Sequence, residues 1–197
     1  MRIVAGSFKG TKLYTPTDKK TRPLKDMVKE SVFNFLMHSK KILFQIEHSN
    51  ILDLYSGTGS FGLECLSREA QQVIFIEKEK EAIKILKKNI QKLKGENKTK
   101  IYFNDVINII KEPKKNSSLP TDLKFDLIFC DPPFKETNIN KLIELIITKD
   151  LLKKNGIIIF HRHKNAKDQL TNCFKIIDER IYGISRITFG HILHPSL

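Results

Sequence analysis

The chain has few of the residues and segments that mark secreted or membrane proteins. It contains only three cysteines, Cys65, Cys130 and Cys173, which lie far apart and form neither a metal motif nor a disulfide framework. Each lies within an apolar run, so we expect buried thiols in a reducing cytoplasm. No apolar run approaches the roughly 18 residues of a membrane span, and residues 1–20 lack the apolar segment of a signal peptide. We therefore expect a cytoplasmic protein with no membrane contact and no metal ion.

Acidic residues are also scarce. The 22 Asp and Glu residues oppose 35 Lys and Arg residues, which gives a net charge of +13. Such an excess indicates a polyanionic partner, most commonly nucleic acid. The alternative is a chain that uses lysine wherever a solvated surface is needed. Residues 1–41 hold ten basic and three acidic residues, and this concentration favours a basic arm used for binding.

Beyond residue 48, apolar segments alternate with helical patterns. We expect strands at 50–54, 72–77, 100–103, 125–130 and 156–161, and two more that meet near Gly183. We expect helices at 25–37, 62–69, 78–94, 105–112 and 138–149. Strands that are apolar throughout and alternate with helices indicate a parallel sheet covered on both faces. The predicted fold is α/β and Rossmann-like: a seven-stranded, mostly parallel sheet with the last strand antiparallel, preceded by a small N-terminal hairpin and helix.

A glycine-rich turn, DLYSGTGSFG (53–62), joins the first of these strands to the next helix. Gly57, Gly59 and Gly62 match G-x-G-x-x-G, and Glu77 ends the second strand, 20 residues after Gly57. Glycines let the backbone turn sharply and approach a ligand closely. The acid could accept both hydroxyls of an adenosine ribose. The alternative is a tight turn followed by a solvated glutamate.

Two ligands suit this turn, a dinucleotide and S-adenosylmethionine. A dinucleotide would place its pyrophosphate on the helix N-terminus, where the carboxylate of Asp53 would crowd it. The same carboxylate suits the cationic methionyl end of S-adenosylmethionine, so Asp53 favours that cofactor. After the third strand, Asn104 and Asp105 could hydrogen-bond the adenine amine, or Asp105 could simply cap the next helix.

The fourth strand ends in Asp131-Pro132-Pro133-Phe134, an unusual end for a core strand. This strand is expected beside the first, at the switch point where open α/β sheets bind ligands. The prolines fix the backbone and lack N–H groups, so the Asp131 carboxylate and the Pro132 carbonyl form a rigid pair of acceptors. They could hold both N–H groups of a nucleobase amine while Phe134 stacks on the base, a contact of about 1–3 kcal/mol. The alternative is a strand stop followed by a turn.

These acceptors predict methyl transfer to an aromatic amine. The lone pair of such an amine is delocalised into the ring, and two acceptors on its hydrogens favour the tetrahedral nitrogen that attacks. A sulfonium donor is already activated, so alignment supplies much of the remaining acceleration, with no metal or covalent intermediate. His161, Arg162 and His163, after the fifth strand, fit a solvated strand end better than catalytic bases.

Five segments resemble known enzymes. LDLYSGTGSFGLECLSR (52–68) and the DPPF motif are similar to segments of the class I (Rossmann-like) S-adenosylmethionine-dependent methyltransferases. RIVAGSFKGTKL (2–13), TRPLKDMVKESVFNFL (21–36) and IYGISRITF (181–189) resemble, more narrowly, the RsmD family of 16S ribosomal RNA guanine-N2 methyltransferases. Two residues depart from that family's pattern: Ser185 stands where Thr is expected, and Glu69 where Gly is frequent.

The resemblance implies a site as well as a fold. Residues 1–41 would contact RNA, and residues 42–197 would form the S-adenosylmethionine-binding methyltransferase domain. The residues implied to hold the cofactor are Asp53, Tyr55, Ser56, Gly57, Thr58, Gly59, Glu77, Lys78, Asp105 and Val106. The residues implied to receive the target amine are Asp131, Pro132, Pro133 and Phe134. The residues implied to bind RNA are Arg2, Lys9, Arg22, Lys25, Lys29, Phe134 and Tyr182. Arg22, next to Pro23, could instead serve only as a helix-entry residue.

The predicted reaction is methyl transfer to the exocyclic N2 amine of a guanine in small-subunit ribosomal RNA, either naked or bearing its proteins, with no obligate protein partner. The target base must be unpaired or flipped out of its stack. An adenine-N6 methyltransferase on DNA or RNA is the alternative, because DPPF presents acceptors to either amine. An NAD-dependent oxidoreductase would share the glycine turn but leaves Asp53 and DPPF unexplained. A non-catalytic RNA-binding assembly factor would not need DPPF.

Overall fold

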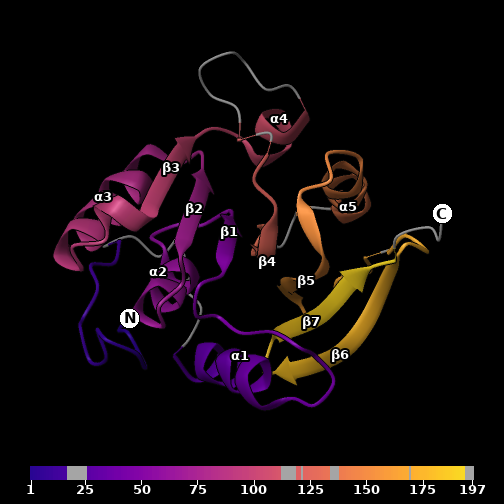
Figure 1. Cartoon of the computed structure of the whole chain (residues 1–197), viewed down its shortest axis with the longest axis horizontal. Helices are drawn as coiled ribbons and strands as arrows, with labels where there is room; N and C mark the ends of the chain where they lie inside the picture. Colours follow the sequence, from indigo (N-terminus) through magenta and orange to yellow (C-terminus); the bar gives the residue numbers. More distant parts are fainter. Residues whose placement is uncertain (17–25, 112–118, 121, 134–137, 169, 194–197) are drawn as a thin grey trace.

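The computed structural model describes residues 1–16, 26–111, 119–120, 122–133, 138–168 and 170–193. Its strands form one seven-stranded sheet in the order β3-β2-β1-β4-β5-β7-β6 (Figure 1). The strands are β1 (Asn50–Leu54), β2 (Gln72–Glu77), β3 (Thr99–Phe103), β4 (Phe125–Cys130), β5 (Leu152–His163), β6 (Phe174–Tyr182) and β7 (Ser185–Ile192). The helices are α1 (Asp26–His38), α2 (Ser60–Ser67), α3 (Lys80–Lys92), α4 (Val106–Lys111) and α5 (Ile139–Thr148), and the short 3-10 helix η1 (Glu96–Lys98) precedes β3.

The strand directions confirm the predicted topology. β1 is parallel to both β2 and β4, β2 is parallel to β3, and β4 is parallel to β5. β7 lies between β5 and β6 and is antiparallel to both, so the last strand of the chain is the one that reverses. The chain leaves β1 toward β2 on one side, while β4 lies on the other side, and the switch point therefore falls between β1 and β4.

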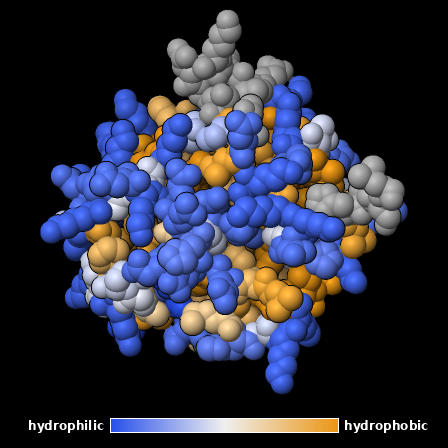
Figure 2. Space-filling view, viewed as in Figure 1, coloured by the Kyte–Doolittle hydropathy of each residue, from blue (hydrophilic) through white to orange (hydrophobic). Residues whose placement is uncertain are grey.

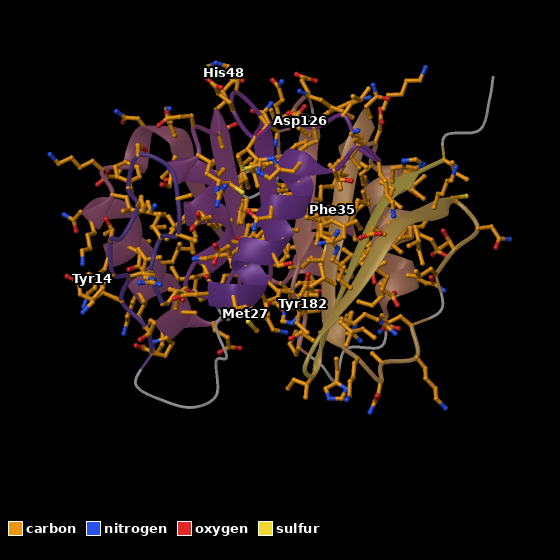
Figure 3. The ribbon with its side chains drawn as sticks, turned by 90° about the horizontal axis from the view of Figure 1, so that it is seen from below. Tyr14, Met27, Phe35, His48, Asp126 and Tyr182 are labelled. Atoms are coloured by element: carbon orange, nitrogen blue, oxygen red, sulfur yellow. The ribbon has the colours of Figure 1, made fainter. Side chains whose placement is uncertain are left out.

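Helices cover both faces of the sheet, as the unbroken apolar strands predict. α1, α2 and α3 share a core with one face, and α4 and α5 share a core with the other. On the first face, the ring of Phe61 stacks between Phe33 and Phe129, with centroid distances of 5.0 and 3.9 Å. Phe35 of α1, labelled in Figure 3, packs against Phe189 of β7 with a ring-centroid distance of 4.2 Å. These ring contacts fix α1 across the middle of the sheet.

The first residues form the short hairpin that the sequence predicts. Arg2 and Lys12 pair in an antiparallel bridge, and the side chains of Ile3 and Leu13 are buried. The hairpin and α1 belong to the same hydrophobic core as β1, β4 and β7. The functional division of the chain at residue 41 stays a prediction.

The surface seen in Figure 2 is mostly hydrophilic, with smaller apolar areas between the polar side chains. Among the helices that the structure describes, none has the length and apolar character needed to cross a membrane. Cys65 and Cys130 are buried, as predicted, but Cys173 is exposed. The prediction is wrong for Cys173 because this residue lies in the turn before the edge strand β6, where its neighbour Phe174 points inward instead.

Candidate active site

The turn between β1 and α2 has the backbone that its glycines predict. Gly57 and Gly59 have φ angles of 54° and 85°, in the left-handed region. A Cβ on Gly59 would lie 2.4 Å from Cδ1 of Leu86, so a larger residue would have to displace that buried side chain and would also be strained at this φ. A Cβ on Gly57 would meet no described atom within 4 Å. The backbone at Gly57 therefore borders open space, as the close approach of a cofactor requires.

Glu77 is fixed beside this turn by backbone hydrogen bonds. Its Oε2 accepts the N–H of Gly57 at 2.7 Å, and its Oε1 accepts those of Lys78 and Glu79 at 2.7 and 2.8 Å. The side chain is buried, which excludes the alternative of a solvated glutamate. A carboxylate has about four acceptor positions, so these bonds leave room for one ribose hydroxyl. For Glu77 to bind both ribose hydroxyls, one of its three hydrogen bonds from backbone N–H groups would have to be replaced by a bond from a hydroxyl.

Asp53 points into the protein and holds the first turn of α2. Its Oδ2 accepts the N–H of Gly62 at 2.9 Å. Burial raises the pKa of Asp53 well above its usual value, and the nearby charges of Asp131 and Glu77 raise it further, against the lowering effect of the Gly62 hydrogen bond. Asp53, Glu77 and Asp131 thus form an acidic group at the carboxyl ends of β1, β2 and β4, which suits a cationic ligand. Direct contact between Asp53 and a cofactor stays a prediction.

Asp105 caps α4, the simpler of its two predicted roles. Its Oδ1 accepts the N–H of Ile107 at 3.0 Å and that of Asn108 at 3.3 Å. Its Oδ2 lies 3.2 Å from Nζ of Lys78, and this ion pair joins the ends of β2 and β3. Val106, the first residue of α4, is buried in the core that α4 shares with α5. Adenine binding by Asp105 and Val106 stays a prediction.

The remaining residues of the turn support its shape. The N–H of Ser56 donates to the carbonyl of Ile76 at 3.1 Å. The carbonyl of Thr58 accepts a hydrogen bond from Nδ2 of Asn89 at 3.1 Å. Tyr55 is half-buried and has a φ of 57°. Cofactor contacts of Tyr55, Ser56 and Thr58 are not tested by these interactions.

Asp131 stands at the switch point, where the sequence predicts it. β4 pairs with β1 as far as Cys130 and Leu54, and the N–H of Asp131 points to the carbonyl of Leu54 at 3.4 Å. The Asp131 side chain is 25% exposed, so it lies at the carboxyl end of the central strand β4 and not in the hydrophobic interior. Pro132 is buried and Pro133 is exposed, and Phe134 lies outside the described residues.

The structure contradicts the sequence interpretation at two residues of β5, His161 and Arg162. His161 and Arg162, expected at a solvated strand end, are only 6% and 3% exposed. Nδ1 of His161 lies 2.8 Å from Oδ1 of Asp131, and Nη1 of Arg162 donates to the carbonyl of Pro133 at 3.2 Å. The expectation fails because β5 continues to His163, alongside β7. The only signal in the sequence was the polar end of the strand itself.

The predicted RNA contact by Lys29 is wrong. The Lys29 side chain is fully buried, and its Nζ lies 3.3 Å from Oε2 of Glu64 and donates to the carbonyl of Arg2 at 2.6 Å. Lys29 is one of the buried residues of α1, together with Val28 and Val32, so its charge faces the protein and not a phosphate.

The other residues predicted to bind RNA remain candidates. Arg2 and Lys9 are exposed, and Nε of Arg2 lies 3.7 Å from Asp26. The half-buried Tyr182 hydrogen-bonds through its hydroxyl to that of Ser31 on α1. Arg22 and Lys25 lie outside the described residues.

The carboxyl ends and the amino ends of the parallel strands lie on opposite sides of the molecule, and a groove lies at the amino ends. Figure 3 shows Met27 and Tyr182 toward the edge that holds the carboxyl ends of the parallel strands, and His48 and Asp126 toward the opposite edge. A groove of about 720 Å³ lies at that opposite edge. It is lined by Met37, Ile42, Leu43, Phe44, Gln45, Asp126, Lys153, Lys154, Asn155 and Gly156. The groove is therefore separate from the acidic group of the candidate active site.

The strand order and the arrangement of the glycine turn beside the Asp-Pro-Pro segment define a class I methyltransferase fold. A candidate methyltransferase from Escherichia coli has the same fold, with a TM-score of 0.78 over 96% of each chain at 24% sequence identity. A candidate methylase from Haemophilus influenzae matches with a TM-score of 0.75 over 98% of each chain at 32% identity.

Comparison of sequences identifies the family. Residues 1–191 match the family described as "Conserved hypothetical protein 95". The chain is 32% identical over 185 residues to "Ribosomal RNA small subunit methyltransferase D" of Haemophilus influenzae, covering 93% of this chain and 90% of that protein. It is 33% identical over 171 residues to the protein of the same name from Buchnera aphidicola, covering 87% and 80%. The chain belongs to this family, the RsmD family.

Proposed function

We propose that this protein uses S-adenosylmethionine to methylate the exocyclic N2 amine of a guanine in small-subunit ribosomal RNA. The observation that carries the proposal is the position of Asp131, held at the switch point beside Asp53 and the glycine turn. Family relatives named for methylation of small-subunit ribosomal RNA support the RNA substrate, as does the net charge of +13.

The acceptors of the Asp-Pro-Pro segment account for the choice of an amine. The Asp131 carboxylate accepts one N–H of the amine and the Pro132 carbonyl accepts the other, so the nitrogen lone pair is turned away from the ring. The cofactor supplies, when bound, a methyl group on a positively charged sulfur, which keeps the C–S electron pair as the methyl group leaves. Once the nitrogen has gained the methyl group it loses one proton. Asp131 accepts that proton and passes it to water.

The cofactor side of the site fits S-adenosylmethionine better than a phosphate-bearing ligand. The charges of Glu77 and Asp131, which act on the buried Asp53, favour an ammonium and a sulfonium at this end of the sheet and disfavour a pyrophosphate. Glu77 has acceptor capacity for a ribose hydroxyl, and open space adjoins Gly57.

An adenine-N6 methyltransferase remains the second candidate, because the same two acceptors suit the amine of adenine. One experiment distinguishes these two candidate functions. Small ribosomal subunits and naked 16S RNA are each incubated with a methyl-labelled donor, and the labelled nucleoside is identified after digestion. We expect N2-methylguanosine. Label in N6-methyladenosine would establish the second candidate on RNA, and no label in either RNA preparation would refute the proposed methylation of guanine in ribosomal RNA.

A further inference from the structure

His161 links the candidate catalytic aspartate to the last strand of the sheet. β4 and β5 pair in parallel with Cys130 opposite Phe160, so Asp131 and His161 follow at neighbouring positions and point to the same face. Nδ1 of His161 lies 2.8 Å from Oδ1 of Asp131, and its Nε2 lies 2.8 Å from Oγ of Ser185 on β7. The three side chains form a row from the Asp-Pro-Pro segment to the start of β7.

The partners of the ring assign its protons. A carboxylate oxygen is an acceptor, so the contact with Asp131 favours the tautomer of His161 that carries its hydrogen on Nδ1. In the neutral ring, Nε2 is then an acceptor, and the hydroxyl of Ser185 is the donor that it requires. Ser185 thereby stabilises the tautomer whose Nδ1–H faces Oδ1 of Asp131 across 2.8 Å.

We propose that His161 is a positioning residue for methyl transfer: its Nδ1 contacts Oδ1 of Asp131 at 2.8 Å and so leaves Oδ2 directed at the target amine. The inference rests on the proposed function, in which Asp131 accepts an N–H of that amine. A carboxylate that turned freely about its last bond would present the amine with a poorly aligned acceptor for much of the time. A donor fixed on one oxygen removes that freedom.

Arg162 fixes the same segment from the opposite face of the sheet. Successive residues of a strand point to opposite faces, and Nη1 of Arg162 reaches the carbonyl of Pro133 at 3.2 Å. The guanidinium is held in turn by Asp168, whose Oδ1 lies 3.1 Å from Nε and 3.0 Å from Nη2. Asp168 is also bound by Arg186 of β7 at 2.9 Å. The Asp-Pro-Pro segment is thus held at both ends by consecutive residues of β5.

Stability alone does not account for a histidine at this position. His161 pairs across the sheet with the fully buried Ile187, in surroundings where an apolar side chain would pack without any loss of hydration. A buried imidazole loses hydration that only well-placed partners restore. The partners here are a candidate catalytic carboxylate and a hydroxyl that orients the ring.

The test compares two substitutions that remove the ring equally but differ in where they place an amide. In His161→Asn the side-chain nitrogen falls near the position of Nδ1 and still donates to Asp131, whereas in His161→Gln it falls near Nε2. We expect His161→Gln to lower kcat about 10- to 100-fold, the range for losing a hydrogen bond to a charged group. KM for the ribosomal subunits and the Kd of the cofactor should stay within about twofold. His161→Asn should restore most of the lost kcat.

A second pair of variants, at Ser185, provides the same test if either His161 variant fails to fold. Ser185→Ala removes the hydroxyl that orients the ring and should lower kcat, whereas Ser185→Thr keeps it and should not. Equal losses in the two members of a pair, or losses confined to KM, would overturn the inference.

Asp131→Ala, measured alongside, separates this inference from the function on which it rests. If Asp131→Ala is inactive while His161→Gln retains full kcat, the positioning role fails and the proposed function stands. If Asp131→Ala itself turns over normally, the proposed function fails.

Discussion

The ammonium nitrogen of Lys29 lies 3.3 Å from Oε2 of Glu64, and both side chains are fully buried. Glu64 also accepts the N–H groups of Val4 and Ala5 at 2.8 and 2.9 Å and pairs with Nε of Arg68 at 3.1 Å. One buried ion pair therefore joins the N-terminal hairpin, α1 and α2, and α2 begins directly after the glycine turn.

Removing the carboxylate should destabilise the protein strongly. Glu64→Gln leaves the charge of Lys29 buried without its counter-ion, and we expect the free energy of unfolding in urea to fall by about 3–5 kcal/mol. Lys29→Met should have a smaller effect, because Arg68 still neutralises Glu64. The exposed Lys9→Met is the control and should change stability by no more than about 0.5 kcal/mol. A Glu64→Gln protein as stable as this control would contradict the account.

The basic arm should increase RNA affinity by neutralising phosphates. Because Lys29 is buried, the relevant substitutions are Arg22→Gln and Lys25→Gln together. They should weaken binding to 16S RNA and reduce the slope of log affinity against log salt by about 0.7–0.9 for each phosphate that the arm no longer neutralises. Lys153→Gln with Lys154→Gln removes the same charge at the opposite edge of the sheet and should leave the slope near that of the wild type. Equal slopes in both double variants would remove Arg22 and Lys25 from the interface.

Asp53 should make the unliganded protein less stable as pH rises. Burial raises its pKa in the folded state, so the folded state binds this proton more tightly than the unfolded state, where the pKa is about 3.9. Below a pH of about 3.9 Asp53 is protonated in both states, and its contribution to the free energy of unfolding is fully present. That contribution is lost as the pH rises through the folded-state pKa.

Asp53→Asn keeps an acceptor for the N–H of Gly62 but cannot ionise. We expect its Tm to exceed that of the wild type by an amount that grows from about pH 4 upward, while its affinity for S-adenosylmethionine falls. Thermal melts across pH measure the first effect and calorimetric titration the second. Parallel melting curves at every pH would show that Asp53 does not titrate in this way.

The three thiols should differ sharply in reactivity. Burial raises the pKa of Cys65 and that of Cys130, and the charge of Asp53 adds to both shifts, so neither presents a thiolate to solvent. Cys173 is exposed. A maleimide reagent should therefore label one thiol in the native protein and three after denaturation, and Cys173→Ser should abolish native labelling. Native labelling of Cys65 or Cys130 would contradict their burial.

The sheet and the glycine turn were predictable because their signals are local. β1, β2 and β4 are short runs of apolar residues, and the glycines at 57 and 59 mark a turn that requires positive φ. Glu69, where the resemblance led us to expect glycine, has a φ of 64°, a conformation that glycine adopts without strain.

The details that the sequence did not predict depend on distant partners. Burial of His161 requires Ser185, 24 positions later, and the pairing of β5 with β7. Burial of Lys29 requires a carboxylate on α2. In both cases a polar residue is stable in the interior only because another element supplies its partner, and spacing along one helix or strand does not reveal that.

The most direct test of the central claim is single-turnover methyl transfer by Asp131→Ala, with Asp126→Ala at the other end of the same strand as the control. We expect Asp131→Ala to slow transfer by about 100-fold or more while its Kd for S-adenosylmethionine stays within about threefold of the wild type. Asp126→Ala should transfer at close to the wild-type rate. An Asp131→Ala protein that transfers as fast as the wild type would contradict the account.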